Sequence, residues 1–501
     1  MFWADRLAGE IKERFGSKSI FIRDEKTVSG RVHIGSMRGV AIHGAIAEAL
    51  SKAGLDCVFK YEFNDFDPMD DIPAYLDKTV FERHFGKPLR DIPSPDSSAK
   101  NFAEYFASEF RAVIEGAGWH PEFYYGSELY LGGKMDGAIR EALENAEDVR
   151  RIYKEVSGSQ KESWWLPVSV ICEQCGKILG TEARNFDGKE VEYSCKCGHG
   201  GKISPFGGRA KLPWKVEWPA KWKVLGVEVE GGGKDHSTKG GARDVANHIS
   251  REVFNYDPPF DVPYEFVLVG GRKMSSSKGR GSSAREVSEL MPPKIFRLAL
   301  LGKDFSQQIN FDPSGDTIPV LYDQYDKLAE NYRAGVKDDY ARLFEFLGDP
   351  DLPDFLLRFS QVAFIAQMPH MDLLEEAQKI KGSALNAEEK KELEERAAYA
   401  KKWLAEYAPE KHVFKLQEQL PEAANNLSDV QKAALKSLLG FIEAAPVMPS
   451  GEDLHQKLHE LKEFKAVYLA FLGKDHGPKA GWFLSALGRE FVISRLREAS
   501  A

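Results

Sequence analysis

Short apolar runs alternate with amphipathic stretches over the first 315 or so residues of the chain. Residues 19–23 and 57–63 have the length and composition of buried strands. Between them, one helical face carries mostly small apolar side chains: Ile34, Met37, Ala41, Ala45 and Ala49. A strand, a helix and a second strand in this order predict a βαβ unit with a parallel strand pair. The pattern therefore predicts a doubly wound, parallel-sheet α/β domain of the Rossmann type.

The pattern changes twice further along the chain. Helices are predicted around 99–117, 127–156 and 238–254, and strands at 224–229 and 264–269. Residues 163–202 are rich in Trp, Cys and Gly, which indicates an insertion, and beyond about 317 strand signals vanish while charges alternate at helical spacing. The expected organisation is an α/β catalytic domain at 1–162 and 203–316, an insertion at 163–202 and an all-helical domain at 317–501.

Charge and apolar content narrow the classes of protein to consider. A net charge of −9 over 501 residues does not fit a protein that coats nucleic acid through its phosphates. A polyanion would need a local basic track, for which the sequence offers Lys211, Lys215, Lys221 and Lys223. No apolar run approaches the roughly 20 residues of a bilayer span, and residues 1–6 lack the features of a secretory signal. We therefore expect a cytoplasmic protein that does not associate with membranes.

Four of the five cysteines form two close pairs within the insertion. Cys172 and Cys175 are followed 20 residues later by Cys195 and Cys197. Four thiolates at this spacing are typical of a tetrahedral structural zinc site that holds together a module with little core. His199 is a reserve ligand, and redox-active or incidental cysteines are the alternative interpretation.

Two further segments carry candidate chemistry. Ser29–Ser36, with the sequence SGRVHIGS, lies at the first strand-to-helix turn, where glycines and free helix N–H groups can approach a phosphate. Gly270–Arg280 follows the strand predicted at 264–269 and has four cations among eleven residues, which suits a loop that closes over a polyphosphate. Taken singly, the first could be a plain capped turn and the second a solvated basic loop.

Together, in this order, the two segments resemble the HIGH and KMSKS signatures of class I aminoacyl-tRNA synthetases. Four more segments resemble the class I lysyl-tRNA synthetases in particular: 64–68, 214–220, 232–244 and 321–328. The resemblance covers most of the chain. It implies ATP-dependent attachment of lysine to tRNA(Lys) through a lysyl-adenylate, with Mg²⁺ accompanying ATP, and a helical domain on the anticodon side of the tRNA.

The resemblance also implies roles for individual residues. The catalytic group would be His33, Ser36, Lys273, Ser276 and Lys278. ATP would be bound by Ser29, Gly30, His33, Gly35, Gly233, Asp235, Met274, Ser275 and Ser277. The amino-acid pocket would be formed by Glu25, Thr27, Asp65, Trp214, His236 and Tyr264.

Several of these positions allow a second interpretation or depart from the family pattern. Trp214 and Tyr264 also suit ordinary core packing, and Asp235 also suits capping of a helix that starts near Ser237. Glu25 stands where the family usually has glycine, and Val28 where it usually has proline. Glu25 and Asp65 are the acidic candidates for the lysine ammonium.

Three alternative functions remain. A glutamyl-type synthetase would need an arginine at the amino-acid pocket. A non-catalytic paralogue that only binds RNA or a protein would be expected to have lost His33 or Lys273, and both are present. A small-molecule nucleotidyltransferase that ignores tRNA would have no use for a long helical C-terminal domain.

Overall fold

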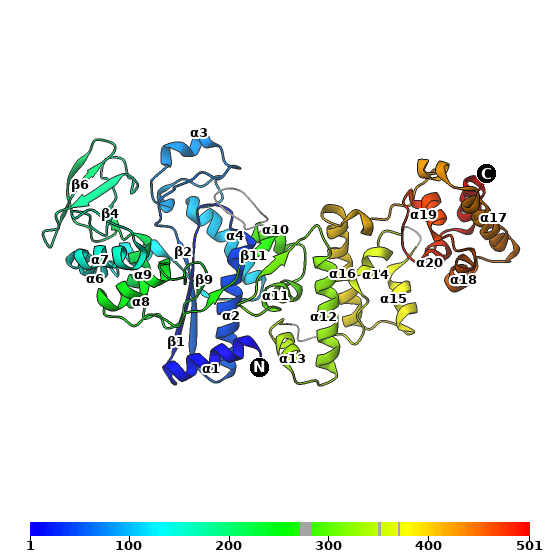
Figure 1. Cartoon of the computed structure of the whole chain (residues 1–501), viewed down its shortest axis with the longest axis horizontal. Helices are drawn as coiled ribbons and strands as arrows, with labels where there is room; N and C mark the ends of the chain where they lie inside the picture. The colour runs from blue at the N-terminus through cyan, green and yellow to red at the C-terminus, as the bar shows by residue number, and fades with distance from the viewer. Residues whose placement is uncertain (271–282, 349–351, 369–370) are drawn as a thin grey trace. The chain divides into compact units, whose positions relative to one another are not determined.

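The computed structural model describes residues 1–270, 283–348, 352–368 and 371–501. The chain forms two compact units, one of residues 1–311 and 331–348 and the other of residues 312–330 and 349–501. The first contains the parallel sheet and the second is built from helices (Figure 1). Among the described residues no helix is both long and apolar enough to cross a membrane.

The main sheet of the first unit is parallel. Strand β1 (Ile20–Thr27) pairs with β2 (Cys57–Asn64), which pairs with β3 (Glu122–Tyr125). The β1–β2 register runs from Ile20 opposite Cys57 to Thr27 opposite Asn64. Val229 extends the sheet beyond β1 through bridges to Ile22 and Phe260. The predicted parallel α/β fold is confirmed.

Helix α2 (Met37–Lys52) connects β1 to β2, as predicted, and is almost entirely buried. Its glycines permit the close packing: a Cβ on Gly39 would lie 2.7 Å from both Asp24 Oδ2 and the Tyr264 hydroxyl, and one on Gly44 would lie 2.4 Å from the Trp119 ring. Because any larger side chain would push these groups apart, the two glycines fix how near α2 lies to the residues behind it.

The helices around the sheet differ from the prediction in detail. Helices α1 (Trp3–Phe15), α3 (Lys78–Phe81), α4 (Phe102–Gly116) and α9 (Ala242–Glu252) are single elements. The helical structure predicted around 127–156 is confirmed. Three helices occupy the segment, α5 (Gly126–Leu131), α6 (Asp136–Glu144) and α7 (Ala146–Ser157), because Gly133, at φ 70°, interrupts the first and Asn145 the second.

The strand predicted at 224–229 is wrong. Helix α8 (Trp214–Leu225) runs into this segment and ends at Gly226, which adopts the left-handed conformation at φ 72°. Only Val229 then joins the sheet. The strand predicted at 264–269 is two short strands, β10 (Pro263–Tyr264), paired with β9 (Gly232–Gly233), and β11 (Val267–Val269), paired with β12 (Ile309–Phe311).

Three further helices complete the first unit. Helices α10 (Ala284–Ser288) and α11 (Pro293–Leu301) follow β11, and α13 (Asp339–Glu345) comes after the first helix of the second unit. Arg342 of α13 forms a bidentate ion pair with Asp5 of α1, with N–O distances of 2.8 Å. The chain thus returns to the first unit after residue 330.

The insertion is a small antiparallel module. It contains β4 (Ser169–Val170), β5 (Thr181–Arg184), β6 (Val191–Cys195) and β7 (Gly200–Ile203), and β8 (Ala210–Lys211) pairs back onto β4. Its few apolar side chains, among them Val170, Val191 and Ile203, share a core with α6 and α7. Such a thin core leaves room for a metal to add stability.

The described part of the second unit contains helices and no strands. In chain order the helices are α12 (Thr317–Arg333), α14 (Phe359–Ile365), α15 (Leu373–Lys381), α16 (Ala387–Glu406), α17 (Asp429–Ala444), α18 (Gly451–Leu461), α19 (Phe464–Leu472), α20 (Ala480–Ser485) and α21 (Arg489–Ala499). Fully buried Arg396 links α16 to α12 through a bidentate pair with Asp326. The predicted all-helical character of the C-terminal part is confirmed.

Candidate active site

The turn after β1 holds the first signature at the carboxyl edge of the sheet. Gly30 lies at φ 158°, and a Cβ there would come within 2.8 Å of the Tyr75 hydroxyl. Residues Ile34–Ser36 then form a single 3-10 turn that leads into α2. Free N–H groups at the start of a long helix attract anions, so Ser29, Gly30, His33, Gly35 and Ser36 occupy a position suited to phosphate.

The chain that follows the second signature lies beside the first signature. Ser283 forms a β-bridge with His33, and the amide of Ala284 donates to the carbonyl of Val32 at 2.8 Å. Ser283 also caps α10 by accepting from the amide of Glu286. Of the second signature, Lys273, Met274, Ser275, Ser276, Ser277 and Lys278 lie outside the described residues. The flanks of that loop, Gly270 after β11 and Ser283 at the His33 turn, are described.

A second glycine edge lies on the β9–β10 pair. The amide of Lys234 donates to the carbonyl of Tyr264 at 2.9 Å, and a Cβ on Gly233 would lie 3.0 Å from Asp235 Oδ1. The alternative role of Asp235 as a helix cap is wrong, because α9 begins only at Ala242 and its N-cap is Gly241. Burial raises the pKa of Tyr264 well above its usual range, so this phenol stays neutral.

An aromatic wall stands next to this edge. The Trp214 ring stacks on Trp218, with centroids 5.8 Å apart, and His236 meets Trp214 edge-on at 5.4 Å. Trp214 is 40% exposed, which rules out plain core packing for this side chain. The structure therefore brings together Trp214 and His236, which the family resemblance placed in one pocket, and leaves Trp214 partly exposed.

Beneath this wall runs a buried network of charges that the sequence analysis missed. Arg23 of β1 is fully buried and donates to Glu230 at 2.5 Å, to Glu62 at 2.6 Å, to the Tyr124 hydroxyl at 3.0 Å and to Glu25. Four of the five N–H groups of its guanidinium thus donate to partners within this chain. The signal in the sequence was the presence of charged residues in otherwise apolar strands.

Two buried lysines, Lys221 of α8 and Lys211 of β8, extend the network. Lys221 contacts Glu62 at 2.5 Å and Glu217 at 3.3 Å, and Lys211 contacts Glu217 at 2.5 Å and Asp67 at 2.8 Å. Both lysines are less than 5% exposed. The predicted basic track for phosphates is therefore wrong for Lys211 and Lys221, and Lys223 is held by both carboxylate oxygens of Glu141.

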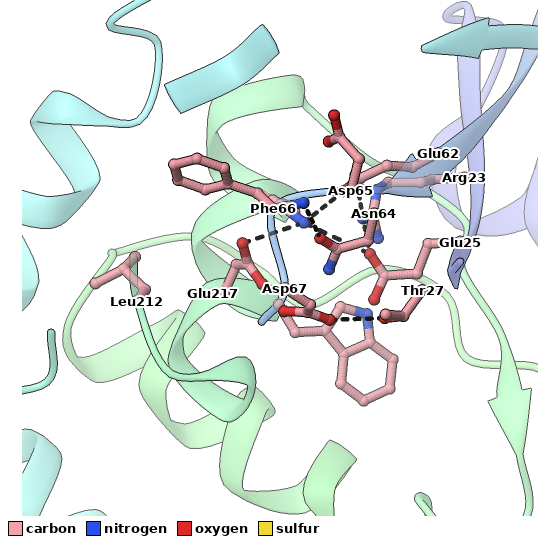
Figure 2. Close-up of polar contacts among 12 residues, drawn as sticks. Arg23, Glu25, Thr27, Glu62, Asn64, Asp65, Phe66, Asp67, Leu212 and Glu217 are labelled. Atoms are coloured by element: carbon pink, nitrogen blue, oxygen red, sulfur yellow. Dashed lines mark hydrogen bonds and ion pairs between the residues drawn. The ribbon is translucent and has the colours of Figure 1, made fainter. Parts of the chain in front are cut away.

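Figure 2 shows the acidic residues of the predicted pocket, of which Glu25 is partly exposed and Asp65 is buried. The Thr27 hydroxyl donates to Asp67 at 2.6 Å, and Glu25 lies on the same strand two residues earlier. Asp65, in contrast, accepts from the amide and the hydroxyl of Ser127 at 2.8 and 2.7 Å, so its carboxylate holds the start of α5. Of the two acidic candidates, Asp65 is already engaged on both oxygens.

Comparison with known proteins identifies the family. A family model described as tRNA synthetases class I (K) matches residues 1–346. The sequence is 35% identical to a lysine--tRNA ligase of Methanosarcina barkeri, over 99% of this chain and 97% of that protein. It is 34% identical to a lysine--tRNA ligase of Thermoplasma acidophilum, over 99% and 98% of the two chains.

The chain belongs to the class I tRNA synthetases (K). Among solved structures, a glutamate-tRNA synthetase of Elizabethkingia anophelis aligns with 96% of this chain and 99% of its own, at 14% identity and a TM-score of 0.45. Because that likeness is weak, it carries no argument about specificity. The resemblance inferred from the two signatures is confirmed by the family match.

The geometry bears on the glutamyl alternative. An arginine does lie beneath the pocket of this synthetase, but Arg23 is fully buried and bound by three carboxylates, those of Glu25, Glu62 and Glu230. It cannot reach a substrate carboxylate without leaving them. The residues predicted for the amino-acid pocket include the acids Glu25 and Asp65, which would favour a cationic substrate side chain over an anionic one.

Burial alone would raise the pKa of Glu62, but Lys221 and Arg23 outweigh it and lower that pKa to about 2. Burial lowers and the facing carboxylates raise the pKa of Lys221, which ends well above its usual range. Both groups are therefore charged at neutral pH. A buried pair of this kind is stabilising only as long as both partners are present.

Replacing Lys221 by Met should destabilise the first unit strongly. The variant leaves Glu62 and Glu217 buried with one cation fewer, and breaking such a pair costs about 3–5 kcal/mol. Lys223→Met is the matched control on the same helix, since its pair with Glu141 is partly exposed and should be worth less than about 1 kcal/mol. Urea unfolding followed by tryptophan fluorescence measures both. Equal losses would contradict the assignment.

Acid should remove the contribution of Glu62. Its pKa in the folded protein is below the ordinary value of 4.5, so its stabilisation is complete above pH 4.5 and is lost as the pH falls toward 2. The urea midpoint of the unaltered protein should therefore fall across this window, and the fall should be smaller in Glu62→Gln. A pH dependence identical in the two proteins would show that Glu62 does not contribute.

Proposed function

We propose that this synthetase attaches lysine to tRNA(Lys) at the expense of ATP, through a lysyl-adenylate. The observation that carries the proposal is similarity to lysine--tRNA ligases over 97% or more of both chains. No large segment of those relatives is left unmatched. The acidic residues of the predicted pocket and the partly exposed Trp214 add a chemical reason, because both features suit an ammonium on an apolar stem.

Adenylate formation would occur at the carboxyl edge of the sheet. The lysine carboxylate attacks the α-phosphate of ATP and pyrophosphate leaves, so the protein mainly positions the reactants and offsets negative charge. His33, Ser36 and the start of α2 would face the phosphates, with Ser29, Gly30, Gly35, Gly233 and Asp235 around the nucleotide. Lys273, Ser276 and Lys278, with Met274, Ser275 and Ser277, would act from their loop, and Mg²⁺ would neutralise the leaving pyrophosphate.

The amino-acid pocket would use these acidic residues and the aromatic wall. Trp214 and His236 would pack against the stem of the substrate, while Thr27, Tyr264 and Glu25 would line its polar side. Asp65 would act through Ser127 and the start of α5, as a positioning residue. The helical residues 317–501 would contact the anticodon side of the tRNA, and the protein would work in the cytoplasm.

The four cysteines of the insertion fit a structural zinc. Their sulfur atoms all lie within 4.8 Å of one another, with Cys172–Cys197 at 3.6 Å and Cys175–Cys195 at 3.7 Å. A tetrahedral zinc with Zn–S bonds of about 2.3 Å requires sulfur–sulfur distances near 3.8 Å. The ring of the reserve ligand His199 lies instead against Tyr193, at 6.0 Å. The four cysteines would thus hold zinc without a histidine.

Purified protein should contain about one zinc per chain, and Cys172→Ser should release it and loosen the insertion. Metal analysis and limited proteolysis of residues 163–202 are the measurements. Cys57→Ser is the control, because the thiol of Cys57 is outside the cluster and donates only to the carbonyl of Ala47. Protein prepared without chelator that lacks zinc would rule out the site.

Amino-acid-dependent exchange of pyrophosphate into ATP, measured with all twenty amino acids, tests the function. Lysine alone should support rapid exchange, and His33→Ala should slow it by about 10²-fold or more. Exchange with glutamate instead would favour the glutamyl alternative. No exchange with any amino acid, combined with tRNA binding in a filter assay, would favour a non-catalytic paralogue, and exchange without tRNA binding would favour a small-molecule nucleotidyltransferase.

A further inference from the structure

The Glu25 carboxylate is the least satisfied group of the buried network. Its Oε2 atom contacts Arg23 and lies 3.6 Å from the ammonium of Lys221. Its Oε1 atom has no hydrogen-bond partner among the described residues. The side chain is 19% exposed, whereas those of Glu62, Glu217 and Glu230 are at most 2% exposed. Glu25 is therefore a partly exposed member of a network whose other glutamates are buried.

The other exposed carboxylate of the network is already occupied. Asp67 uses Oδ1 for the ammonium of Lys211 and Oδ2 for the hydroxyl of Thr27. Asp65 is committed to Ser127 in the same way. Of these three carboxylates, only Glu25 has an oxygen with no hydrogen-bond partner among the described residues.

The network also carries more negative than positive charge. Five carboxylates face three cations: Glu25, Glu62, Asp67, Glu217 and Glu230 against Arg23, Lys211 and Lys221. An excess of two negative charges in a largely buried network is costly, and a cation placed beside Glu25 would relieve one of them. The Oε1 atom of Glu25 is the point at which such a cation can make a hydrogen bond.

We infer that Glu25 accepts a hydrogen bond from the ε-ammonium of the substrate and supplies the missing positive charge of the network through it. The inference rests on the proposed lysine specificity and adds the residue that enforces it. The substrate ammonium becomes the fourth cation of a network that already holds one guanidinium and two ammonium groups. A neutral or anionic side chain of the same length would leave the excess uncompensated, so discrimination comes from the charge balance as well as from one contact.

Binding of the substrate should be linked to a proton. Burial raises the pKa of Glu25, and although Arg23 and Lys221 oppose this effect the pKa stays above its usual value. The charged groups that act on it are Arg23 and Lys26 of β1, Glu62 of β2, Lys221 of α8 and Glu230 beyond α8. Since only the ionised carboxylate attracts an ammonium, lysine affinity should fall as the pH drops through the pKa of Glu25.

Glu25→Gln removes the charge while keeping the volume of the side chain. The half-saturating lysine concentration in pyrophosphate exchange should rise about 10- to 100-fold, and that for ATP should stay within about twofold. Preference for lysine over norleucine, which has the same stem without the ammonium, should fall by a similar factor. The pH dependence of lysine saturation should flatten. Glu122→Gln on β3, whose partner Lys60 lies on the same sheet, is the matched control.

The outcomes separate this inference from the proposed function. If the unaltered protein supports lysine-dependent exchange and Glu25→Gln leaves lysine saturation and the norleucine ratio unchanged, Glu25 does not bind the substrate and the inference fails alone. If Glu25→Gly improves lysine saturation, Glu25 obstructs the pocket and the inference is overturned. If the unaltered protein exchanges with no amino acid, the proposed function fails first. Glu25→Asp, which keeps the charge, should retain most of the lysine preference.

Discussion

The carboxylate of Glu62 sits in the middle of a parallel sheet, where an isolated charge would cost several kcal/mol. It is tolerated because Arg23 of β1 and Lys221 of α8 meet it from two sides. These contacts place α8 over the sheet in one register, and α8 in turn carries Trp214. The position of this tryptophan thus depends on the charge balance of the network. A core of aliphatic side chains would hold the same elements together without determining which residue of α8 faces which strand.

The parts of the molecule set by local chain preferences were predictable from the sequence. The sequence of residues 20–64 predicts a strand, a helix of small residues and a second strand, and the structure has these elements in that order. The cysteine cluster could be predicted because two close cysteine pairs at such spacing are typical of a metal site. The helical C-terminal part followed from its charge periodicity.

The rest depended on pairings that only the folded chain shows. The sequence of Val224–Val229 predicts a strand. In the structure, helix α8 extends from Trp214 to Leu225 and ends at Gly226, so the helix occupies the start of that segment. The sequence suggested that Lys211 and Lys221 belong to a basic surface. The partner of Lys221 is Glu62, which lies 159 residues away along the chain, and the local sequence does not indicate that pairing. The pocket residues Thr27, Trp214 and His236 were named from family resemblance, and that resemblance could not indicate that Asp65 would be occupied by Ser127. Long-range electrostatic partners are the information that a single sequence carries least visibly.

The return of residues 331–348 to the first unit affects how the protein can be made. Helix α1 is synthesised long before residues 331–348, yet Asp5 pairs with Arg342 of that segment, and the rings of Phe2 and Phe346 lie 5.1 Å apart. Between them, residues 312–330 of the other unit have already been synthesised. The catalytic unit can therefore be completed only after the helical unit has begun to emerge, and the chain passes between the two units three times. Assembly of one unit is thus coupled in time to the other, and no single cut or fusion point would let evolution exchange the helical unit as a whole.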